Sequence, residues 1–326
     1  MLVSFGLNTL KPLIDGRKEV IFLCDENTAI HCLPLVSGFI PIAKTISIHV
    51  GEQNKTIETC NLIWAELLKQ QVTRNAILIC IGGGVVTDLG GFCASTFKRG
   101  IDFVLVPTSL LGMVDAAIGG KTGINVGNIK NSVGLFANPI ATIVDDIFLN
   151  TLPQREAIAG MAEMLKHGLI ADVDHWHEMS TLALQRKLPT MEQIQASIHI
   201  KETIVEADPT EQGQRKLLNF GHTIGHAIEA ASLQTNKPLL HGEAVAWGMV
   251  AETALSLKHT SLSKQEASKI VKVLTKVYVE SKPDNFDEYT LLGYMQNDKK
   301  RSEDSTNFTL LQAIGNCVWD VEVAYK

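Results

Sequence analysis

Short runs of apolar, largely β-branched residues alternate with helical patterns up to about residue 145. These runs predict strands at residues 19–24, 43–50, 76–81, 103–107 and 141–145, and KTIETCNLIWAELLKQQ (55–71) predicts a helix between two of them. Unbroken apolar runs are typical of strands buried on both faces, and strands separated by helices are typical of parallel sheets. The sequence therefore predicts a Rossmann-like α/β domain with a mainly parallel sheet.

The pattern changes after about residue 150. Apolar residues then recur at helical spacing, as in 192–207 and 244–259, and the segment 307–323 predicts a small hairpin. With 326 residues the chain exceeds the ~250–300 residues at which a single hydrophobic core stops growing. We therefore expect two domains, an α/β domain over residues 1–150 and a mainly α-helical domain over residues 151–326.

Charge and cysteine usage exclude several classes of protein. A formal net charge of -6 argues against a nucleic-acid groove, which normally requires a basic surface. No apolar run reaches the ~18 residues of a membrane span, and the first residues lack the basic-then-apolar order of a signal peptide. The six cysteines are scattered, without a CxxC pair. We expect a cytoplasmic protein with reduced cysteines and with neither nucleic acid nor a membrane as its partner.

A glycine-rich turn follows the strand predicted at 76–81. The segment IGGGVVTDLGGF (81–92) leaves this strand and opens a helix, so that backbone N–H groups and the helix dipole can face a diphosphate. The dinucleotide-binding fingerprint is incomplete, because Thr87 stands where its third glycine belongs. The turn is therefore typical either of a nucleotide site or of an ordinary tight connection.

A second glycine-rich segment, DAAIGGKTGINVGNIKN (115–131), contains GGKT. The P-loop pattern fails there, because Asp115 stands where its first glycine is required. We expect a flexible loop that carries Asp115, Lys121, Lys130 and Asn131. Such a loop either surrounds a phosphorylated or carboxylated ligand or is an ordinary solvated loop with surface lysines.

Two histidines lie one helical turn apart in the apolar segment LLNFGHTIGHAIEA (217–230). His222 and His226 have a spacing that suits a metal, but the glutamate of the HExxH metalloprotease motif is missing. His241 and Glu163 also lie in apolar surroundings. Two imidazoles and a carboxylate are typical of a catalytic divalent site with an open coordination position. Each residue taken singly is also compatible with a hydrogen-bonded core group or a helix-surface group.

Several blocks of the sequence are specific as an ordered set. They are GGGVVTDLGGFCASTFKRG, VPTSLLGMVDAAIGGKTGIN, FLNTLPQREAIAGMAEMLKHG, RKLLNFGHTIGHAIEA and LLHGEAVAWGM, within residues 19–300. In this combination the chain resembles the 3-dehydroquinate synthase family of the sugar-phosphate cyclase superfamily. One block departs from the family pattern, because VGNIKN stands where the family has a histidine-proline-leucine-glycine turn before a lysine-asparagine pair.

The resemblance implies an NAD-binding N-terminal domain, a helical C-terminal domain that binds metal and substrate, and a homodimer. It implies that Glu163, His222 and His241 hold one divalent ion, zinc or cobalt. It also implies that His226 faces the substrate's phosphate and that Arg99 reaches into the neighbouring subunit's site. The residues that it places around NAD are Asp25, Asn27, Glu52, Lys55, Gly82, Gly83, Gly84, Asp88, Thr108, Ser109, Lys121 and Lys130. Those that it places around the substrate are Asp115, Lys121, Lys130, Asn131, Lys166, Lys201, Arg215, Asn219 and either Lys299 or Lys300.

The activity implied by the resemblance belongs to the shikimate pathway, which leads to the aromatic amino acids. A phosphate-eliminating carbon–oxygen lyase converts the sugar acid 3-deoxy-D-arabino-heptulosonate 7-phosphate to 3-dehydroquinate and phosphate. NAD takes a hydride from a ring carbon that bears a hydroxyl, and the resulting ketone acidifies the neighbouring C–H so that phosphate is eliminated. The hydride is then returned within the same turnover, the ring opens, and an intramolecular aldol step closes the carbocycle. The metal polarises the substrate's oxygens.

Three alternatives share parts of this pattern. Another cyclase, such as a 2-deoxy-scyllo-inosose or valiolone synthase, takes a substrate without a carboxylate, which an arginine at 215 disfavours. An alcohol dehydrogenase of the glycerol dehydrogenase kind does not need the lysine-rich loop and releases NADH. A non-catalytic metal or nucleotide sensor does not need the substrate residues. Arg215 precedes Asn219 by four positions (219 - 215 = 4), so we expect a helix that turns both side chains to the same side.

Overall fold

The computed structural model describes residues 2–40, 43–127, 129–283, 288–295, 301–302 and 305–324. The chain divides into two units, Met1–Pro153 and Gln154–Lys326, against an expected boundary after residue 150. Each unit has a core of its own and is described by itself.

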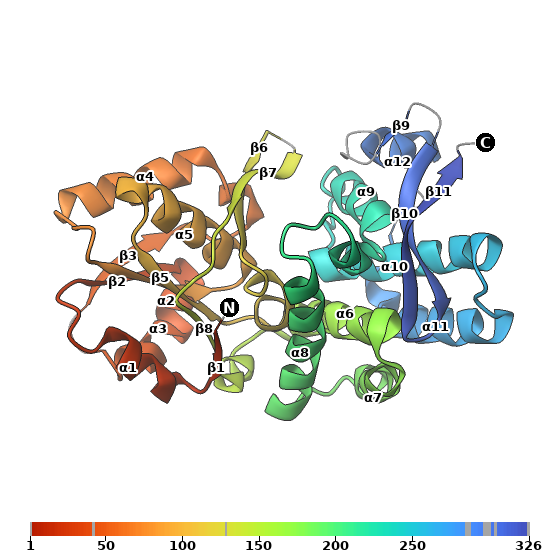
Figure 1. The fold of residues 1–326 in the computed structure, drawn as a ribbon, viewed down its shortest axis with the longest axis horizontal. Helices are drawn as coiled ribbons and strands as arrows, with labels where there is room; N and C mark the ends of the chain where they lie inside the picture. The colour runs from red at the N-terminus through yellow and green to blue at the C-terminus, as the bar shows by residue number, and fades with distance from the viewer. Residues whose placement is uncertain are drawn as a thin grey trace. The chain divides into compact units, whose positions relative to one another are not determined.

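Within the described residues, the first unit contains a six-stranded parallel sheet with helices on both of its faces (Figure 1). β4 is buried along its whole length, because both faces of its apolar run are covered. The predicted parallel sheet is confirmed at every predicted strand, whereas the edge strand β1 has only 3 residues and does not stand out in the sequence. The strand order is β1 (Val3–Phe5), β8 (Ala141–Val144), β5 (Asp102–Pro107), β4 (Ile77–Gly82), β2 (Val20–Asp25) and β3 (Lys44–Ile48).

Two longer helices share the main core of this unit. α4 (Ile57–Lys69) buries Cys60, Ile63 and Leu67 in one cluster with α5 (Gly84–Thr96) and the central strands. The helical spacing of the apolar residues in 55–71 thus predicts α4 correctly. The shorter elements are η1 (Leu7–Thr9), α1 (Leu10–Ile14), α2 (Glu26–His31), α3 (Leu33–Ser37), η2 (Glu52–Asn54), η3 (Phe97–Arg99), η4 (Gly112–Ala116) and η5 (Asp146–Asn150).

The order of the strands reverses between β2 and β4. From β2 the chain forms β3 on one side and then returns to form β4 on the other side of β2. The carboxyl ends of these two strands, Asp25 and Gly82, therefore lie at a point from which successive connections leave in opposite directions. In parallel α/β sheets, ligands bind at such a point.

The expectation of a flexible loop over 115–131 is wrong. The chain forms the π-helical turn η4 and then an antiparallel hairpin of β6 (Lys121–Val126) and β7 (Ile129–Phe136). Its glycines allow close approach of the two strands, because a Cβ at Gly134 would lie 2.3 Å from Thr122 O. A local reading of glycine as flexibility misses this role, since the role depends on the partner strand.

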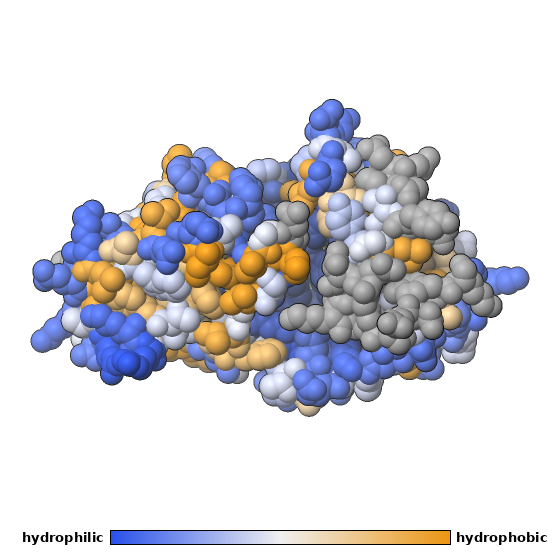
Figure 2. Space-filling model, turned by 90° about the horizontal axis from the view of Figure 1, so that it is seen from above, coloured by the Kyte–Doolittle hydropathy of each residue, from blue (hydrophilic) through white to orange (hydrophobic). Residues whose placement is uncertain are grey.

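The hairpin exposes apolar side chains. Val126, Ile129, Val133, Leu135 and Phe136 are each at least 41% exposed. Figure 2, which looks down from above the view of Figure 1, shows apolar side chains gathered on this face of the first unit. Contiguous exposed apolar surface of this kind is typical of a contact with another molecule.

The second unit is mainly helical, as predicted, and its predicted C-terminal hairpin is confirmed as β10 and β11. α10 packs against α6, α9 and α11. Within the described ranges, none of the helices combines the length and the apolar character that crossing a bilayer requires. The elements are α6 (Gln154–Ala171), α7 (Val173–Leu184), α8 (Met191–Ala207), η6 (Gln214–Asn219), α9 (His222–Ser232), α10 (His241–His259), α11 (Lys264–Val277), η7 (Val279–Ser281), α12 (Glu288–Met295), β9 (Arg301–Ser302), β10 (Ser305–Ala313) and β11 (Asn316–Ala324).

The backbones of α9 and α10 touch. A Cβ at Gly248 would lie 2.0 Å from Gly221 O, and one at Gly225 would lie 3.0 Å from Val245 Cα. Only a residue without a side chain fits at such a crossing. The two helices that carry the candidate histidines are therefore held together by direct backbone contact.

The expectation that Arg215 and Asn219 face the same side is wrong. Both lie on η6, which is a 3-10 helix. At three residues per turn, positions four apart differ by about a third of a turn, so they do not share a face. Arg215 is accordingly buried and Asn219 only half-buried.

Candidate functional site

The site in the second unit is built on the start of α9. Gly221 precedes this helix with a φ of 81°, a left-handed conformation that suits glycine. The fully buried carboxylate of Glu252 accepts hydrogen bonds from Gly221 N at 2.6 Å and Ile224 N at 3.1 Å. Since the first N–H groups of an α-helix have no partner within the helix, Glu252 caps α9 from the neighbouring α10. This cap fixes the backbone from which His222 projects.

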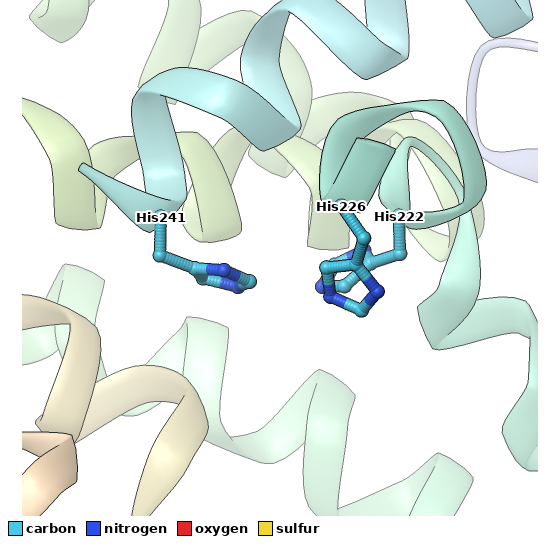
Figure 3. A group of neighbouring side chains, drawn as sticks. All are labelled: His222, His226 and His241. Carbon is cyan, nitrogen blue, oxygen red and sulfur yellow. The ribbon is translucent and has the colours of Figure 1, made fainter. Parts of the chain in front are cut away.

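Three imidazoles converge from α9 and α10 (Figure 3). The ring centroids of His222 and His226 are 5.3 Å apart, those of His222 and His241 5.5 Å, and those of His226 and His241 5.7 Å. One nitrogen of each ring lies within 4.8 Å of one nitrogen of each of the others. The structure thus brings together the two histidines predicted as ligands and His226, which is the exposed member of the group.

Glu163 lies beside these rings. Its carboxylate is fully buried on α6, with Oε1 3.6 Å from His222 Nε2. It also forms an ion pair with Lys166, which is 1% exposed. Burying a carboxylate is costly unless a cation compensates it, and Lys166 supplies that cation in the core. Glu163 and Lys166, both predicted as site residues, therefore lie together next to His222.

The ring orientation of two histidines is fixed through Nδ1. His222 Nδ1 lies 3.2 Å from Phe220 O, and His241 Nδ1 lies 3.2 Å from Glu229 Oε2. Both partners are acceptors, so these contacts favour the tautomer in which Nδ1 donates and Nε2 keeps its lone pair. Two imidazoles and a carboxylate are a donor set that fits zinc or cobalt.

The other predicted residues of this unit lie on α8 and η6. Lys201 and Arg215 are buried, at 6% and 2% exposure. Arg215 Nη1 donates to Pro209 O at 2.7 Å, and Asn219 Nδ2 donates to Glu211 Oε1 at 2.8 Å. These two buried cations and an amide can receive an anionic ligand.

The loop before η6 is organised by Asp208. Its carboxylate accepts from the backbone N–H groups of Gln212, Gly213 and Arg215. These bonds, that from Gly213 foremost, lower the pKa of Asp208 below its usual value. The loop is therefore tied to the first turn of the helix that carries Arg215.

In the first unit the glycine-rich turn joins β4 to α5. Gly83 is the cap residue of α5 and offers no side-chain hydrogen bond to the first turn. Thr108 N donates to Gly82 O at 3.0 Å, and a Cβ at Gly83 would lie 3.2 Å from Ser109 Oγ. The predicted residues Gly82, Gly83, Thr108 and Ser109 thus lie together at the carboxyl ends of β4 and β5. An α-helix start without a side-chain cap suits a diphosphate.

Two predicted cofactor residues lie where β2 ends and α2 begins. Asp25 caps α2, with Oδ1 accepting from Thr28 N at 2.8 Å. Asn27 is exposed on the same helix. The carboxylate of Asp25 therefore already serves the local fold at the point where the strand order reverses.

A polar cluster links the predicted cofactor residues to the hairpin. Buried Lys55 donates to Asp88 Oδ2 at 2.5 Å and to Asn131 Oδ1 at 2.6 Å. Burial raises the pKa of Asp88, and the Lys55 ammonium opposes this shift. Glu52 Oε1 accepts from Asn125 Nδ2 at 2.8 Å. Asn131, predicted to contact the substrate, is thus bonded to a residue predicted to contact NAD.

The remaining predicted residues lie on local turns and strands. Asp115 is in η4, Lys121 begins β6, and Lys130 is in β7. Arg99 is exposed in η3, and Gly84 is the first residue of α5. Lys299 and Lys300 lie outside the described residues.

Sequence reasoning misses Glu229, Glu252, Glu211 and Asn125. Glu252 and Asn125 act through partners that are far away in the sequence, and Glu211 bonds Asn219 across a turn, so nothing in their local sequence marks them. Glu229 does carry a signal, because it follows His222 by seven positions (229 - 222 = 7), which is about two turns of an α-helix. His222, His226 and Glu229 therefore share one face of α9.

The family models and the curated relatives point to one family. The chain matches the family model described as 3-dehydroquinate synthase N-terminal over residues 45–159 and the model described as 3-dehydroquinate synthase C-terminal over residues 160–301. The 3-dehydroquinate synthase of Parabacteroides distasonis is 40% identical over 304 residues, which are 91% of this chain and 86% of that protein.

Two solved structures of other cyclases are similar in fold. A 2-deoxy-scyllo-inosose synthase, solved with carbaglucose-6-phosphate, NAD+ and Co2+, has a TM-score of 0.89 at 23% identity and covers 99% of this chain and 93% of that chain. The 2-epi-5-epi-valiolone synthase of Streptomyces hygroscopicus subsp. jinggangensis, solved with NAD+ and Zn2+, has a TM-score of 0.88 at 25% identity and covers 99% and 92%. At 23% identity, the first of these likenesses speaks for the fold alone.

Proposed function

The chain belongs to the 3-dehydroquinate synthase family, and on this premise we propose that it converts 3-deoxy-D-arabino-heptulosonate 7-phosphate to 3-dehydroquinate and phosphate, a step of the shikimate pathway. The observation that carries the proposal is the 40% identity to a 3-dehydroquinate synthase over 91% of the chain. The two other cyclases reach only 23% and 25% identity despite their similar fold. A cyclase of the inosose or valiolone kind is therefore not favoured.

The proposed cofactors are NAD and one divalent ion, zinc or cobalt. When bound, NAD supplies a reversible hydride acceptor and the metal a Lewis acid for substrate oxygens. Glu163, His222 and His241 would hold the metal, which the buried carboxylate and the two imidazoles with protonated Nδ1 support. His226 is left to face the substrate's phosphate, in keeping with its exposure.

The first unit would hold NAD at the β4–α5 turn. The uncapped start of α5 supports a diphosphate there, and the cluster of Glu52, Lys55 and Asp88 supports a polar part of the cofactor. Lys121, Lys130 and the buried cations Lys201 and Arg215 would balance the phosphate and the carboxylate of the substrate.

One assay tests the proposed reaction. The purified protein is incubated with the heptulosonate phosphate, NAD and Zn2+ or Co2+, and both phosphate and NADH are measured. We expect phosphate release without net NADH, because the hydride returns within each turnover. Net NADH would point to an alcohol dehydrogenase. Efficient cyclisation of glucose 6-phosphate or sedoheptulose 7-phosphate, with the acid a poor substrate, would point to another cyclase.

Arg215 is proposed to bind the substrate's carboxylate. A guanidinium can grip a carboxylate through two parallel hydrogen bonds, which a neutral sugar cannot accept in the same way. We expect Arg215→Ala to cost about 1.5–3 kcal/mol of transition-state stabilisation. This lowers kcat/KM for the heptulosonate phosphate roughly tenfold to more than a hundredfold.

The matched control for Arg215 is Lys216→Ala. It removes the next cation of the same short helix, whose ammonium pairs with Asp320 at 2.6 Å. If both variants lose the same factor in kcat/KM while their melting temperatures stay unchanged, Arg215 does not bind the carboxylate.

We also propose a homodimer in which Arg99 completes the partner's site. The segment Lys98, Arg99 and Gly100 has φ values of 50°, 68° and 111°, a left-handed run that the surrounding structure must sustain. Such strain is typical of functional positions, and the exposed apolar hairpin supports a contact between subunits. The six buried, unbridged cysteines support a reducing compartment, the cytoplasm.

Subunit exchange tests the role of Arg99. Arg99→Ala and Lys121→Ala should each be inactive, and mixing them should restore activity, because a mixed dimer contains one site with both residues. Exchange of Arg99→Ala with the double variant Arg99→Ala/Lys121→Ala is the control and should restore none. No recovery in demonstrated mixed dimers would show that Arg99 acts within its own chain or not at all.

A further inference from the structure

A buried carboxylate outside the proposed ligand set contacts His241. Glu229 lies on α9, and its side chain is 5% exposed, while His241 is the first residue of α10. Glu229 Oε2 and His241 Nδ1 are 3.2 Å apart. This contact therefore joins the two helices at the cluster of imidazoles.

The contact decides which nitrogen of His241 can bind a metal. A neutral imidazole carries one proton, and a carboxylate at Nδ1 attracts that proton as a hydrogen bond acceptor. The lone pair then lies on Nε2, at the other end of the ring. Figure 3 shows the His241 ring directed toward His222 and His226. The nitrogen that Glu229 leaves unprotonated is thus available to the cluster.

The Nδ1 atom of His222 also contacts an acceptor, but this acceptor is a backbone oxygen. This Nδ1 lies 3.2 Å from the backbone oxygen of Phe220, which is fixed by the glycine turn and by the Glu252 cap. Each of the two proposed imidazole ligands therefore has its Nδ1 held by an acceptor. In His241 that acceptor is a side chain, so a substitution can remove it without altering the backbone.

We propose that Glu229 is a positioning residue, which holds His241 with Nε2 toward a divalent cation and thereby sets the affinity of the centre. This inference rests on the metal site of the proposed function. Carboxylates behind metal-bound histidines act in this way, since they fix the tautomer and the orientation of the ring and raise its basicity.

The test starts from protein without bound metal and measures its affinity for added Zn2+. Wild type, Glu229→Ala, Glu229→Gln and His241→Ala are titrated with Zn2+ against a chromophoric chelator, and the visible spectrum of the Co2+ form is recorded. We expect Glu229→Ala to weaken Zn2+ binding by about 10- to 100-fold and to alter the Co2+ spectrum. Glu229→Gln keeps the side chain's shape but loses its charge, so it should fall between wild type and Glu229→Ala.

Ser232→Ala is the matched control. Ser232 is buried on the same turn of α9, where its hydroxyl donates to Glu229 O at 2.7 Å and accepts from Leu239 N at 3.0 Å. Its loss therefore disturbs the surroundings of both Glu229 and His241 but leaves the contact between them in place. Its Zn2+ affinity should match that of wild type. If Glu229→Ala does not fold, Glu229→Gln decides the question on the same scale.

Two negative outcomes are distinguishable. Zn2+ affinities of both Glu229 variants within about twofold of wild type, with an unchanged Co2+ spectrum, would reduce Glu229 to a packing role. Failure of wild type to bind Zn2+, or full binding by His241→Ala, would instead overturn the metal site on which the inference rests.

Discussion

Replacing His222 by alanine is expected to abolish stoichiometric metal binding and to lower activity by about a thousandfold or more, because the Lewis acid contributes several kcal/mol to the reaction. His222 is the imidazole that lies 3.6 Å from the carboxylate of Glu163, so it joins that acid to the other rings. Its side chain is 14% exposed, and the helix start depends on Gly221 and Glu252 rather than on the ring. The fold should therefore survive, which circular dichroism checks alongside metal content by plasma emission.

His226→Ala is the control for this prediction. It should keep stoichiometric metal, since His226 is the exposed member of the cluster and is proposed to face the phosphate. Unchanged metal content in Glu163→Ala, His222→Ala and His241→Ala would refute the ligand set. Loss of metal in His226→Ala but not in Glu163→Ala would replace that set by three imidazoles.

Replacing Glu252 by alanine is expected to lower the free energy of unfolding by about 2–6 kcal/mol, since each of two N–H groups, one buried and one partly buried, loses its acceptor at a cost of about 1–3 kcal/mol. The two groups are Gly221 N and Ile224 N at the start of α9. A loss of this size is a large fraction of the stability of an ordinary domain. Urea unfolding of the metal-free proteins measures it without a contribution from bound metal.

Glu252→Gln provides the comparison. Its amide oxygen can still accept one of the two hydrogen bonds, so its loss of stability should be smaller than that of Glu252→Ala. A Glu252→Ala protein within about 0.5 kcal/mol of wild type, the range of ordinary surface substitutions, would show that the cap is dispensable.

The fold was largely predictable wherever the apolar pattern of an element shows which of its faces are buried. β4 is a continuous apolar run because both of its faces are covered, and α4 repeats its apolar residues at helical spacing because one face is covered. The hairpin of β6 and β7 was not predictable in this way, since its glycines are explained by the opposite strand. Nor does spacing distinguish the three residues per turn of η6 from the 3.6 of an α-helix.

The same distinction applies to the residues of the candidate site. His222, His226, His241 and Glu163 stand out because polar, metal-binding side chains are unusual in apolar segments. Glu252 stands in an equally apolar segment, but its partners are backbone N–H groups. Because every residue type except proline has such a group, the sequence does not identify them. Asn125 likewise acquires its role only when the hairpin brings it to Glu52.

The contact between α9 and α10 limits how a chain of this kind can diverge. A library randomised at position 248 would return folded clones with glycine alone, because any side chain would meet Gly221 O at 2.0 Å. Position 130, on a strand of the exposed hairpin, would tolerate many residues by the same criterion of folding. The pair of helices that carries the histidines therefore restricts substitution through its backbone contact, whereas the exposed hairpin leaves its side chains open to change.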